Sequence, residues 1–369
     1  MQNRKVAFFM PNLAGGGAQR VALILVKEFL KHGLQVDFVL AQAKGEFLKD
    51  LPKDINLIEL NASRVLNTLP GLVRYLRKHS PVAVYSAPQH THIILMLAKM
   101  ISRSSVQVIL HVGNHISTQQ KASRKFQDKL YPALLWLLQR YASVFIAVSD
   151  GVAHDLVRTA QIPPKKVRLV YNPVYQAEMD DLMRQPVIHQ WFNEGQLPVI
   201  LAVGRLVEQK DYPTLIRAFA RVRNLRLVRL VILGEGKLLR ELKKLTAELN
   251  IAGDVDFAGF DPNPYRYMAR CSVFVLSSAW EGFANVVAEA LACGAQVVST
   301  DCKSGPAEIL VNGQYGQLVP VGDEVALADA ILQALDHPLP QDALYRRGRF
   351  FTAESAARQY LAAAGIHLL

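Results

Sequence analysis

The most constraining feature of this sequence is a series of short, continuously apolar runs that alternate with amphipathic segments. Continuous apolar runs are typical of parallel strands that are covered on both faces, and the segments between them have the period of helices. Such alternation predicts a doubly wound α/β domain. The pattern occurs twice without a detectable sequence repeat, so we expect two Rossmann-like domains that face a cleft, with ligands at the carboxyl ends of the strands.

The expected domain boundaries follow from the points at which the alternation stops and restarts. A chain of 369 residues is too long for one ordinary hydrophobic core. Residues 173–197 have no clear period and contain two prolines, so we place a linker there. We therefore expect a first domain at 1–172, a second domain at 198–345, and a final helix within 346–369.

Each apolar run is expected to form a strand. The runs lie at Lys5–Met10, Gln35–Leu40, Val82–Ser86, Val106–His111, Val144–Val148, Val167–Tyr171, Val199–Val203, Leu227–Leu233, Val255–Ala258, Val273–Leu276 and Gln296–Thr300. A long helical stretch at Ala122–Tyr141 contains Pro132, which is expected to kink or restart the helix.

The charge of the chain is unevenly distributed. The net charge is +11, and residues 1–172 hold 23 Lys and Arg against 9 Asp and Glu, while residues 173–369 hold 19 against 22. The basic excess thus lies wholly in the first half. It suggests an anionic partner such as lipid head groups, a pyrophosphate or nucleic acid. A basic exterior that only confers solubility is the alternative.

Composition excludes several classes of protein. The three cysteines match no metal or disulfide spacing and fit a reducing cytoplasm. The apolar stretch near the start is too short for a signal peptide and leads into a glycine loop, so it is expected to be a strand. No run approaches the ~20 apolar residues that span a bilayer. We expect a protein that is soluble or bound at a membrane surface.

One candidate phosphate-binding loop follows the first strand of the second domain. It contains Gly204, Arg205 and Lys210, and Asp211 and Pro213 are typical of the helix start that comes next. A planar guanidinium and a compact ammonium at a strand end suit a diphosphate. A surface loop with two cations is the competing interpretation.

A second candidate loop reads EGFANVVAE, residues 281–289. Glu281 falls in a strand-to-helix loop, and Glu289 lies roughly 6 Å into the helix at 1.5 Å per residue. The free amides near Phe283–Val286 form an anion site between the two carboxylates. A nucleoside-diphosphate sugar fits this arrangement, with the hexose near Glu281, the ribose near Glu289 and the phosphates between. Two unrelated surface glutamates are the alternative.

A third loop contains Gly15, Gly16 and Gly17, with Arg20 in the following helix. It departs from the dinucleotide fingerprint, because position 20 is Arg and no acidic residue ends the second strand. An NAD site is therefore not expected. The exposed amides of such a turn still suit a phosphate or the close approach of an acceptor.

Together these loops resemble those of glycosyltransferases of family 4, which have the two-domain GT-B fold. The resemblance extends over nearly the whole chain. It rests on the glycine loop with Arg20, the loop with Arg205 and Lys210, Gly234–Gly236, Phe257–Gly259, residues 281–289, and residues 301–309 (DCKSGPAEI). In this fold the last helix commonly crosses back onto the first domain, which implies a bend at Gly348. A plain C-terminal helix is the alternative.

The resemblance implies a role for each matching position of the donor site. Arg205 and Lys210, in the loop that begins at Gly204, bind the donor diphosphate and stabilise its charge as it leaves. Glu281 binds the donor hexose and Glu289 the ribose hydroxyls.

Other positions complete the implied donor site. Gly282, Phe283, Ala284 and Asn285 supply amides for the sugar or phosphate, and the loop from Phe260 holds the base. The family's usual proline at position 284 is alanine here, which is expected to loosen the turn.

On the acceptor side, the resemblance implies contributions from Gly15, Gly16, Gly17, Arg20 and a histidine that follows a strand of the first domain. His111 matches that catalytic histidine best, since it directly follows Val106–Leu110. His115 lies close enough to be the alternative, and either could be an ordinary loop histidine.

The resemblance also implies the chemistry. Such enzymes retain the anomeric configuration and use no metal or other cofactor. The sequence contains no Asp-x-Asp motif and no His/Cys cluster, so cationic side chains and helix amides would stabilise the leaving diphosphate. We expect transfer of a hexose or N-acetylhexosamine from a UDP-sugar, with an α-linked product and a front-face path.

The expected acceptor is a glycan or a polyprenyl-diphosphate-linked glycan, extended at the inner face of the cytoplasmic membrane. Phe126, Leu130, Leu134, Leu137 and Leu138 recur at helical spacing beside Lys121, Arg124, Lys125 and Lys129. This pattern favours either a core-facing stripe or a helix edge that rests on anionic lipid.

Two other classes of function are weighed against sugar transfer. A nucleotide-sugar epimerase or hydrolase on the same fold would need an acid/base carboxylate pair that the sequence does not provide. A nucleic-acid binder would need aromatic and basic residues interleaved on one surface, and that pattern is absent. Nucleic acid is therefore not an expected partner.

Overall fold

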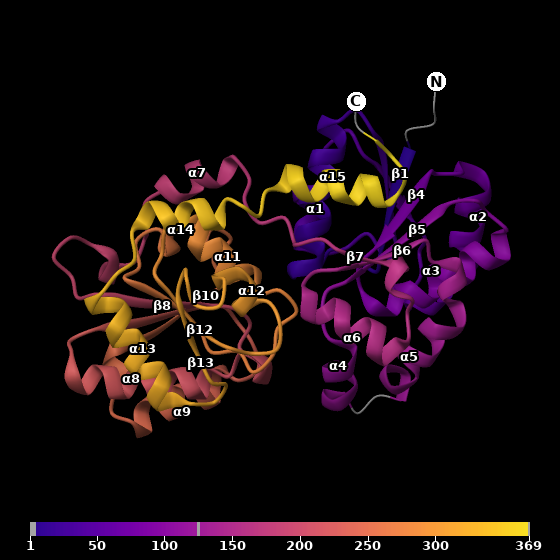
Figure 1. Cartoon of the computed structure of the whole chain (residues 1–369). Coiled ribbons are helices and arrows are strands. Elements are labelled where there is room, and N and C mark those ends of the chain that lie inside the picture. Colours follow the sequence, from indigo (N-terminus) through magenta and orange to yellow (C-terminus); the bar gives the residue numbers. More distant parts are fainter. Residues whose placement is uncertain (1–4, 124–125, 368–369) are drawn as a thin grey trace. The chain divides into compact units, whose positions relative to one another are not determined.

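The computed structural model describes residues 5–123 and 126–367, which form two compact units (Figure 1). Unit 1 contains the chain up to Pro173 together with the residues from Ala353 onward, and unit 2 runs from Val174 to Thr352. The chain therefore passes between the units twice.

Unit 1 is built on a parallel sheet with seven strands among the described residues, in the order β3-β2-β1-β4-β5-β6-β7. This is the doubly wound order, in which the chain reverses direction across the sheet between β1 and β4. The strands are β1 (Lys5–Met10), β2 (Gln35–Leu40), β3 (Asn56–Glu59), β4 (Ala83–Ser86), β5 (Gln107–Val112), β6 (Val144–Ala147) and β7 (Val167–Leu169).

Helices connect these strands and cover the sheet. They are α1 (Gly17–Lys31), α2 (Leu69–His79), α3 (Gln89–Ser102), α4 (Ile116–Ala122), α5 (Phe126–Leu138), α6 (Asp150–Ala160) and the returning α15 (Ala353–Ala363). The core beneath α1 is aromatic, because the rings of Phe8 and Tyr85 stack at 5.1 Å and Phe29 lies 5.6 Å from Phe8. Tyr360 of α15 joins the same core, so the C-terminal helix is part of unit 1 (Figure 1).

Unit 2 repeats the plan with a parallel sheet of six strands in its described residues, in the order β10-β9-β8-β11-β12-β13. The strands are β8 (Val199–Val203), β9 (Arg229–Leu233), β10 (Val255–Gly259), β11 (Val273–Leu276), β12 (Val297–Thr300) and β13 (Gln317–Val319). The helices are α7 (Glu178–Arg184), α8 (Tyr212–Leu225), α9 (Leu239–Glu248), α10 (Tyr265–Met268), α11 (Asn285–Ala292), α12 (Pro306–Leu310), α13 (Glu324–Asp336) and α14 (Gln341–Gly348).

The structure differs from the linker expected at 173–197. That segment contains α7 and packs on unit 2, where Asn263 donates a hydrogen bond to the carbonyl oxygen of Leu182 at 2.9 Å and Arg349 pairs with Asp180 at 2.9 Å. The chain instead crosses between the units within a residue or two of Pro173. The short α7 has too few turns to produce a helical period that the sequence could show.

The end of the chain also differs from the expected single helix within 346–369. It forms α14 in unit 2 and α15 in unit 1, with the crossing at Thr352. Gly348 does not mark this bend. It ends α14, and an added Cβ there would lie 2.0 Å from the backbone nitrogen of Ala292, so glycine is required because α14 packs directly on α11.

The helix expected at Ala122–Tyr141 is interrupted. One helix ends at Ala122, another begins at Phe126, and the latter continues through Pro132 without restarting there. Two of the four edge strands, β3 and β13, were not anticipated, because they are short and mostly outside the buried core and so lack a continuous apolar run.

Candidate functional site

The loop after β8 is held against the loop after β9 by backbone contacts. An added Cβ at Gly234 would lie 2.0 Å from the carbonyl oxygen of Gly204, and one at Gly236 would lie 2.3 Å from that of Leu206. The amide of Leu206 also donates a hydrogen bond to the carbonyl oxygen of Glu235 at 2.8 Å. The two glycines of the Gly234–Gly236 motif therefore fix the position of the loop that carries Arg205 and Lys210.

Lys210 and Glu281 form a direct ion pair. Lys210 Nζ donates to Glu281 Oε1 at 2.6 Å, and the hydroxyl of Ser278 donates to the same oxygen at 2.7 Å. The side chains of the pair are only 15% and 9% exposed. Gln209 donates to the carbonyl oxygen of Trp280 at 2.9 Å. The loops after β8 and β11 are thus joined through the two residues that the sequence singled out.

Arg205 differs from Lys210 in being exposed, and it forms no ion pair within the described part of the chain. Its guanidinium is therefore not committed to a carboxylate of the protein. Asp211, expected to cap the next helix, occupies the N-cap position with φ +43° but accepts a hydrogen bond from the Thr214 hydroxyl at 2.7 Å instead of from a backbone amide.

The start of α11 is held in a left-handed turn. Its N-cap residue Ala284 has φ +67° and ψ +60°, and the alanine side chain has no polar atom that could cap the helix. Gly305 packs directly against the backbone of this turn, because an added Cβ at Gly305 would lie 2.4 Å from the carbonyl oxygen of Phe283. Proline holds φ near −65°, so replacement of the family's proline by alanine accompanies a conformation closed to proline, and does not merely loosen the turn.

The two glutamates of the 281–289 segment lie on either side of this turn. Glu281 precedes it in the loop, and Glu289 is buried on α11. Burial, and to a lesser extent the charge of Glu289, raises the pKa of the Cys293 thiol well above its ordinary value. Phe260, expected near the base, is exposed directly after β10. All the predicted donor residues therefore belong to the loops and the helix start at the carboxyl edge of the unit 2 sheet.

In unit 1, the glycine loop leads from β1 into α1. Gly16 is the N-cap of α1 with φ +131°, and the amide of Arg20 donates to its carbonyl oxygen at 3.1 Å. The first turn of α1 contains no acidic residue. Gly16 and Gly17 are exposed, so the loop presents backbone at the point in the sheet where ligands of doubly wound folds bind.

A narrow and mostly apolar crevice of about 10 Å³ lies at the same point. It is lined by residues from the ends of three strands and two helices, among them Met10, Ala18, Ser86, Ala87, His111 and Tyr360. His111 lies within β5, inside the run predicted at Val106–His111, and not after a strand that ends at Leu110. Its Nδ1 is 2.6 Å from the Tyr360 hydroxyl, and burial lowers its pKa from 6.5 to about 4.

His115 is placed differently. It is the N-cap residue of α4 and lies 3.8 Å from the carboxylate of Asp155 on α6. Asp155 also accepts hydrogen bonds from the amide of Ser117 and the hydroxyl of Thr159, both at 3.1 Å. His115 therefore belongs to a structural network between α4 and α6, whereas His111 lines the crevice beside the glycine loop.

Several residues of the site were not anticipated from the sequence. Ser278 and Gln209 hold the Glu281 loop, and Tyr360 contacts His111 from the other end of the chain. The small polar residues directly after β11 could have indicated Ser278, and Gln209 adjoins the predicted Lys210 in the loop after β8. Nothing local to the sequence indicates Tyr360.

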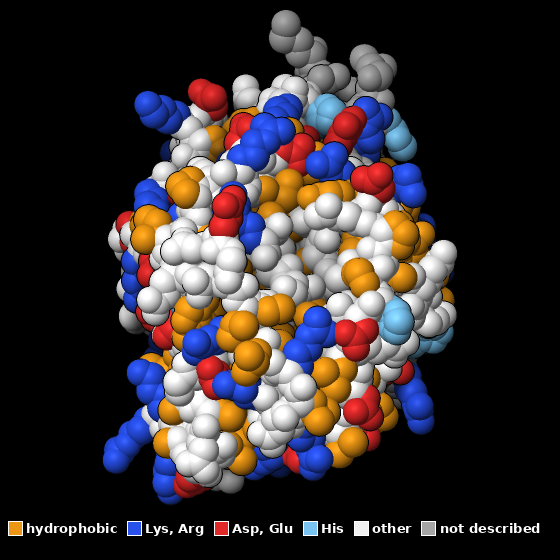
Figure 2. All heavy atoms as spheres, turned by 90° about the vertical axis from the view of Figure 1, so that its left-hand side faces the viewer, with side chains coloured by type: hydrophobic (Ala, Val, Ile, Leu, Met, Phe, Trp, Pro, Cys, Tyr) orange, Lys and Arg blue, Asp and Glu red, His pale blue; other side chains and the backbone are white. Residues whose placement is uncertain are grey.

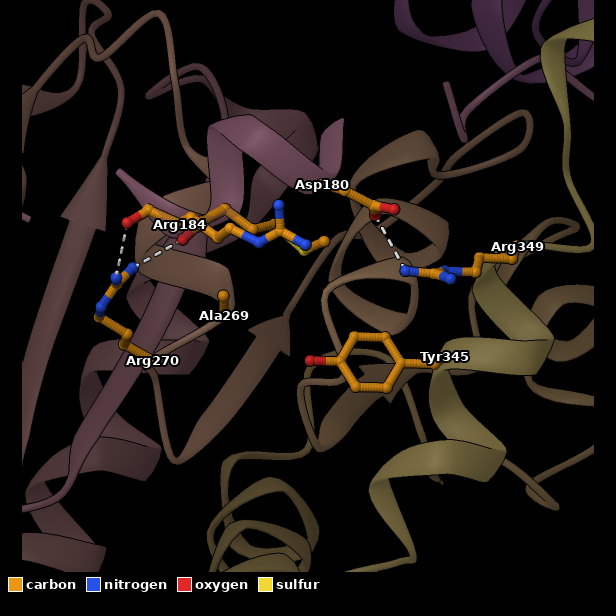
Figure 3. Close-up of a pocket in the computed structure, with 7 residues that line it drawn as sticks. Asp180, Arg184, Ala269, Arg270, Tyr345 and Arg349 are labelled. Carbon is orange, nitrogen blue, oxygen red and sulfur yellow. Dashed lines mark hydrogen bonds and ion pairs between the residues drawn. The ribbon is translucent and has the colours of Figure 1, made fainter. Parts of the chain in front are cut away.

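A surface hollow of about 400 Å³ lies elsewhere in unit 2, between α7, α10 and α14 (Figure 3). Its arginines are committed to structural bonds, since Arg270 donates to the carbonyl oxygens of Met183 and Arg184 and Arg349 pairs with Asp180. Tyr345 also lines this hollow. These bonds fix α7 to its neighbours, and none of the predicted donor residues lines the hollow.

Figure 2 shows Lys and Arg side chains interspersed with Asp and Glu on the visible face, without a large single-sign region.

In the part of the chain that the structure describes, no three His, Cys, Asp or Glu side chains are grouped as metal ligands would be. No helix in that part has both the length and the apolar character to cross a bilayer.

Comparisons with known proteins identify the family. The family model for glycosyl transferases group 1 matches residues 184–350, and that for Glycosyltransferase Family 4 matches residues 15–177. The N-acetylgalactosamine-N,N'-diacetylbacillosaminyl-diphospho-undecaprenol 4-alpha-N-acetylgalactosaminyltransferase of Campylobacter jejuni is 32% identical over 356 residues, which is 92% of each chain. The chain therefore belongs to the family of glycosyltransferases that these two models describe. The lipopolysaccharide 1,6-galactosyltransferase of Escherichia coli is 22% identical over 332 residues, 86% of each chain.

Solved structures show the same architecture. The Anabaena protein HepE in complex with UDP and glucose superimposes with a TM-score of 0.82 at 18% identity, covering 98% of this chain and 99% of its own. The lipopolysaccharide outer core galactosyltransferase WaaB gives a TM-score of 0.73 at 20% identity, with 97% and 98% coverage. The GT-B fold that the motifs predicted is confirmed, and the chain is a glycosyltransferase with two Rossmann-like domains.

Proposed function

We propose that this glycosyltransferase moves a hexose or N-acetylhexosamine from a UDP-sugar to a lipid-linked glycan, with retention of configuration and without a metal ion. The observation that carries the proposal is the buried Lys210–Glu281 pair, which lies with the exposed Arg205 and the start of α11 at one edge of the unit 2 sheet. Cations and helix amides at the carboxyl ends of strands are the groups that bind a diphosphate.

The proposed roles follow from the charges and their surroundings. Lys210 uses one of its three donors on Glu281, which orients the ammonium and leaves two donors for phosphate oxygens. Arg205 supplies a second cation with a planar donor fork. The other oxygen of Glu281 can accept from a hexose hydroxyl, Glu289 from the ribose, and Phe260 provides an exposed ring for the base.

In the proposed reaction, the bond between the sugar C1 and the diphosphate oxygen breaks while C1 bonds to the acceptor oxygen on the same face of the ring. The acceptor hydroxyl proton passes to the departing phosphate oxygen, so no protein base is required. Arg205, Lys210 and the α11 amides stabilise the charge that develops on the diphosphate, which is the contribution that a metal ion makes in other enzymes.

The relatives support the donor and acceptor classes. The Campylobacter relative is named for transfer of N-acetylgalactosamine to a diphospho-undecaprenol-linked sugar, and the Escherichia coli relative for galactosyl transfer in lipopolysaccharide. The HepE structure is named as holding UDP and glucose. The names of the two relatives support a lipid-linked glycan as the acceptor, and the UDP in the HepE structure supports a UDP-sugar as the donor.

A lipid-linked acceptor requires access to a membrane, which we propose is the inner surface of the cytoplasmic membrane. Helix α5 has a face that is suited to contact with this surface. Phe126, Leu130 and Leu137 are exposed on one side of this helix, 72%, 42% and 61% respectively, beside the exposed Lys129 and Trp136. Of the stripe read from the sequence, Leu138 is buried and does not contribute. Exposed apolar side chains with basic neighbours are typical of helices that rest on anionic lipid.

The membrane contact is tested by flotation with anionic vesicles. The enzyme should float at low salt, and charge reversal at Lys121 and Lys129 should release it, whereas Lys244→Glu on the exposed face of α9 should not. A wild-type protein that stays in the soluble fraction would overturn the membrane contact and leave a soluble acceptor. Arg124 and Lys125 of the same basic cluster lie outside the described residues.

The activity is tested by incubating the enzyme in EDTA with a panel of nucleotide sugars and undecaprenyl-diphosphate-linked sugars. We expect transfer from a UDP-sugar and an α-anomeric product signal in proton NMR. Lys210→Ala should lower kcat by about 10²-fold, whereas the exposed Lys244→Ala should have no effect. Transfer that requires added Mg²⁺, or a β-anomeric product, would contradict the proposal.

A further inference from the structure

The C-terminal helix places a tyrosine hydroxyl against the histidine of the crevice. Tyr360 is 1% exposed, and its hydroxyl oxygen lies 2.6 Å from Nδ1 of His111. The two residues are 249 positions apart, and their rings are 6.3 Å apart at an interplanar angle of 29°. The contact therefore ties the last helix of unit 1 to the end of β5.

The direction of this hydrogen bond follows from the surroundings of Tyr360. Burial raises the pKa of Tyr360 above its ordinary value, so the hydroxyl keeps its proton. Within the described residues, His111 is the hydroxyl's hydrogen-bond partner, because the bond from Tyr85 reaches the backbone carbonyl of Tyr360 and not its side chain. A buried hydroxyl proton without an acceptor costs free energy. Tyr360 must therefore donate, and Nδ1 must accept.

The other nitrogen of the ring is left to carry the proton. Burial lowers the pKa of His111 to about 4, so the ring is neutral and holds a single proton. Nε2 makes no hydrogen bond to a described residue and lies beside Gly113, where an added Cβ would be 3.2 Å away. The missing side chain at Gly113 keeps this side of the ring free of a neighbouring side chain.

We propose that Tyr360 is a positioning residue that fixes His111 in the Nε2–H tautomer, so that His111 donates a hydrogen bond to an oxygen of the bound substrate and does not act as a base. The exposed backbone of the glycine loop beside the crevice lies where ligands of doubly wound sheets bind, which makes a sugar hydroxyl or a phosphate oxygen the class of acceptor atom. The identity of that oxygen rests on the proposed function, whereas the tautomer does not.

The tautomer is measured directly by ¹⁵N NMR on protein with labelled histidines and no ligand. The His111 signals are assigned by their loss in His111→Gln, since the chain has 10 histidines. We expect a protonated Nε2 and an unprotonated Nδ1 in the wild type, and a mixture of tautomers in Tyr360→Phe. A protonated Nδ1 in the wild type would overturn the proposal, whatever the enzyme's substrates are.

Kinetics of variants test the consequence. His111→Asn places an amide where Nδ1 lies and removes the Nε2 donor, whereas His111→Gln keeps a donor near Nε2. We expect His111→Gln to retain about tenfold more kcat than His111→Asn, and Tyr360→Phe to lose about tenfold. Equal activity of the Asn and Gln variants would show that the Nε2 donor is not used.

A matched control exists for the tyrosine variant. Tyr131 makes the same buried contact with another histidine, its hydroxyl lying 2.7 Å from Nδ1 of His92. Tyr131→Phe should leave the His111 tautomer and kcat unchanged while costing similar stability. If Tyr131→Phe lowers kcat as much as Tyr360→Phe does, the effect of Tyr360 is structural and the positioning role fails.

Discussion

The left-handed conformation of Ala284 leads to a sharp prediction about the turn that begins α11. Alanine at φ +67° is strained by about 1–2 kcal/mol relative to glycine, because its Cβ is close to the following carbonyl oxygen. Ala284→Gly removes that strain. It also loses the burial of one methyl group, about 0.8 kcal/mol, and gives the unfolded chain more freedom, about 0.4–1 kcal/mol. These contributions nearly cancel, so the free energy of unfolding should change by less than about 0.5 kcal/mol.

Two further substitutions serve as comparisons for Ala284→Gly. Ala288 is fully buried within α11 and has no such strain, so Ala288→Gly should cost about 2 kcal/mol from lost methyl burial and helix propensity. Ala284→Pro would require φ near −65°, which the turn cannot adopt, and should cost about 3 kcal/mol or more.

Urea unfolding of the three variants, followed by circular dichroism and by tryptophan fluorescence, measures these differences. We expect the order Ala284→Gly, Ala288→Gly, Ala284→Pro from most to least stable. An Ala284→Gly variant as destabilised as Ala288→Gly, or a stable and active Ala284→Pro variant, would refute the left-handed turn and with it the orientation of the α11 amides.

Other variants test separate parts of the donor site. Arg205→Ala should lower kcat by about 10²-fold, as Lys210→Ala should, since each removes a cation from the leaving diphosphate; near-normal turnover in both would show that the charge is stabilised elsewhere. Glu289→Ala should mainly raise the KM for the donor, because a ribose contact is present before and during transfer, and an effect confined to kcat would argue against a ribose contact. Gly236→Ala should cost about 1–3 kcal/mol in urea unfolding, since its Cβ would overlap the backbone of the preceding loop, whereas Gly253→Ala, where nothing lies within 4 Å, should be near neutral; equal costs would contradict the loop contact.

The central strands of both sheets could be predicted from the sequence because they are buried on both faces. Gln35–Leu40 and Val199–Val203 have the bounds that their apolar runs predicted. The edge strand Asn56–Glu59 has mostly exposed side chains, so no continuous apolar run marks it. A strand that is buried on both faces can therefore be predicted from its apolar run, whereas an exposed edge strand such as β3 cannot.

The candidate site could be predicted as a set of loops but not as a set of contacts. The motifs indicated that Lys210 and Glu281 serve the same ligand, yet their direct ion pair joins residues 71 positions apart, and only the sheet order brings them together. Tyr360 could not be predicted at all, because no local pattern distinguishes a helix residue that packs on His111 from one that packs elsewhere in the core.

The most direct test of the donor site is isothermal titration calorimetry of the protein with UDP in EDTA. We expect UDP to bind the wild type without a divalent ion, Lys210→Ala and Arg205→Ala to bind at least about tenfold more weakly because each loses a charge-assisted contact, and GDP or ADP to bind more weakly than UDP. Binding that appears only when Mg²⁺ or Mn²⁺ is added, or that is unchanged in both variants, would contradict a metal-free diphosphate site formed by these two side chains.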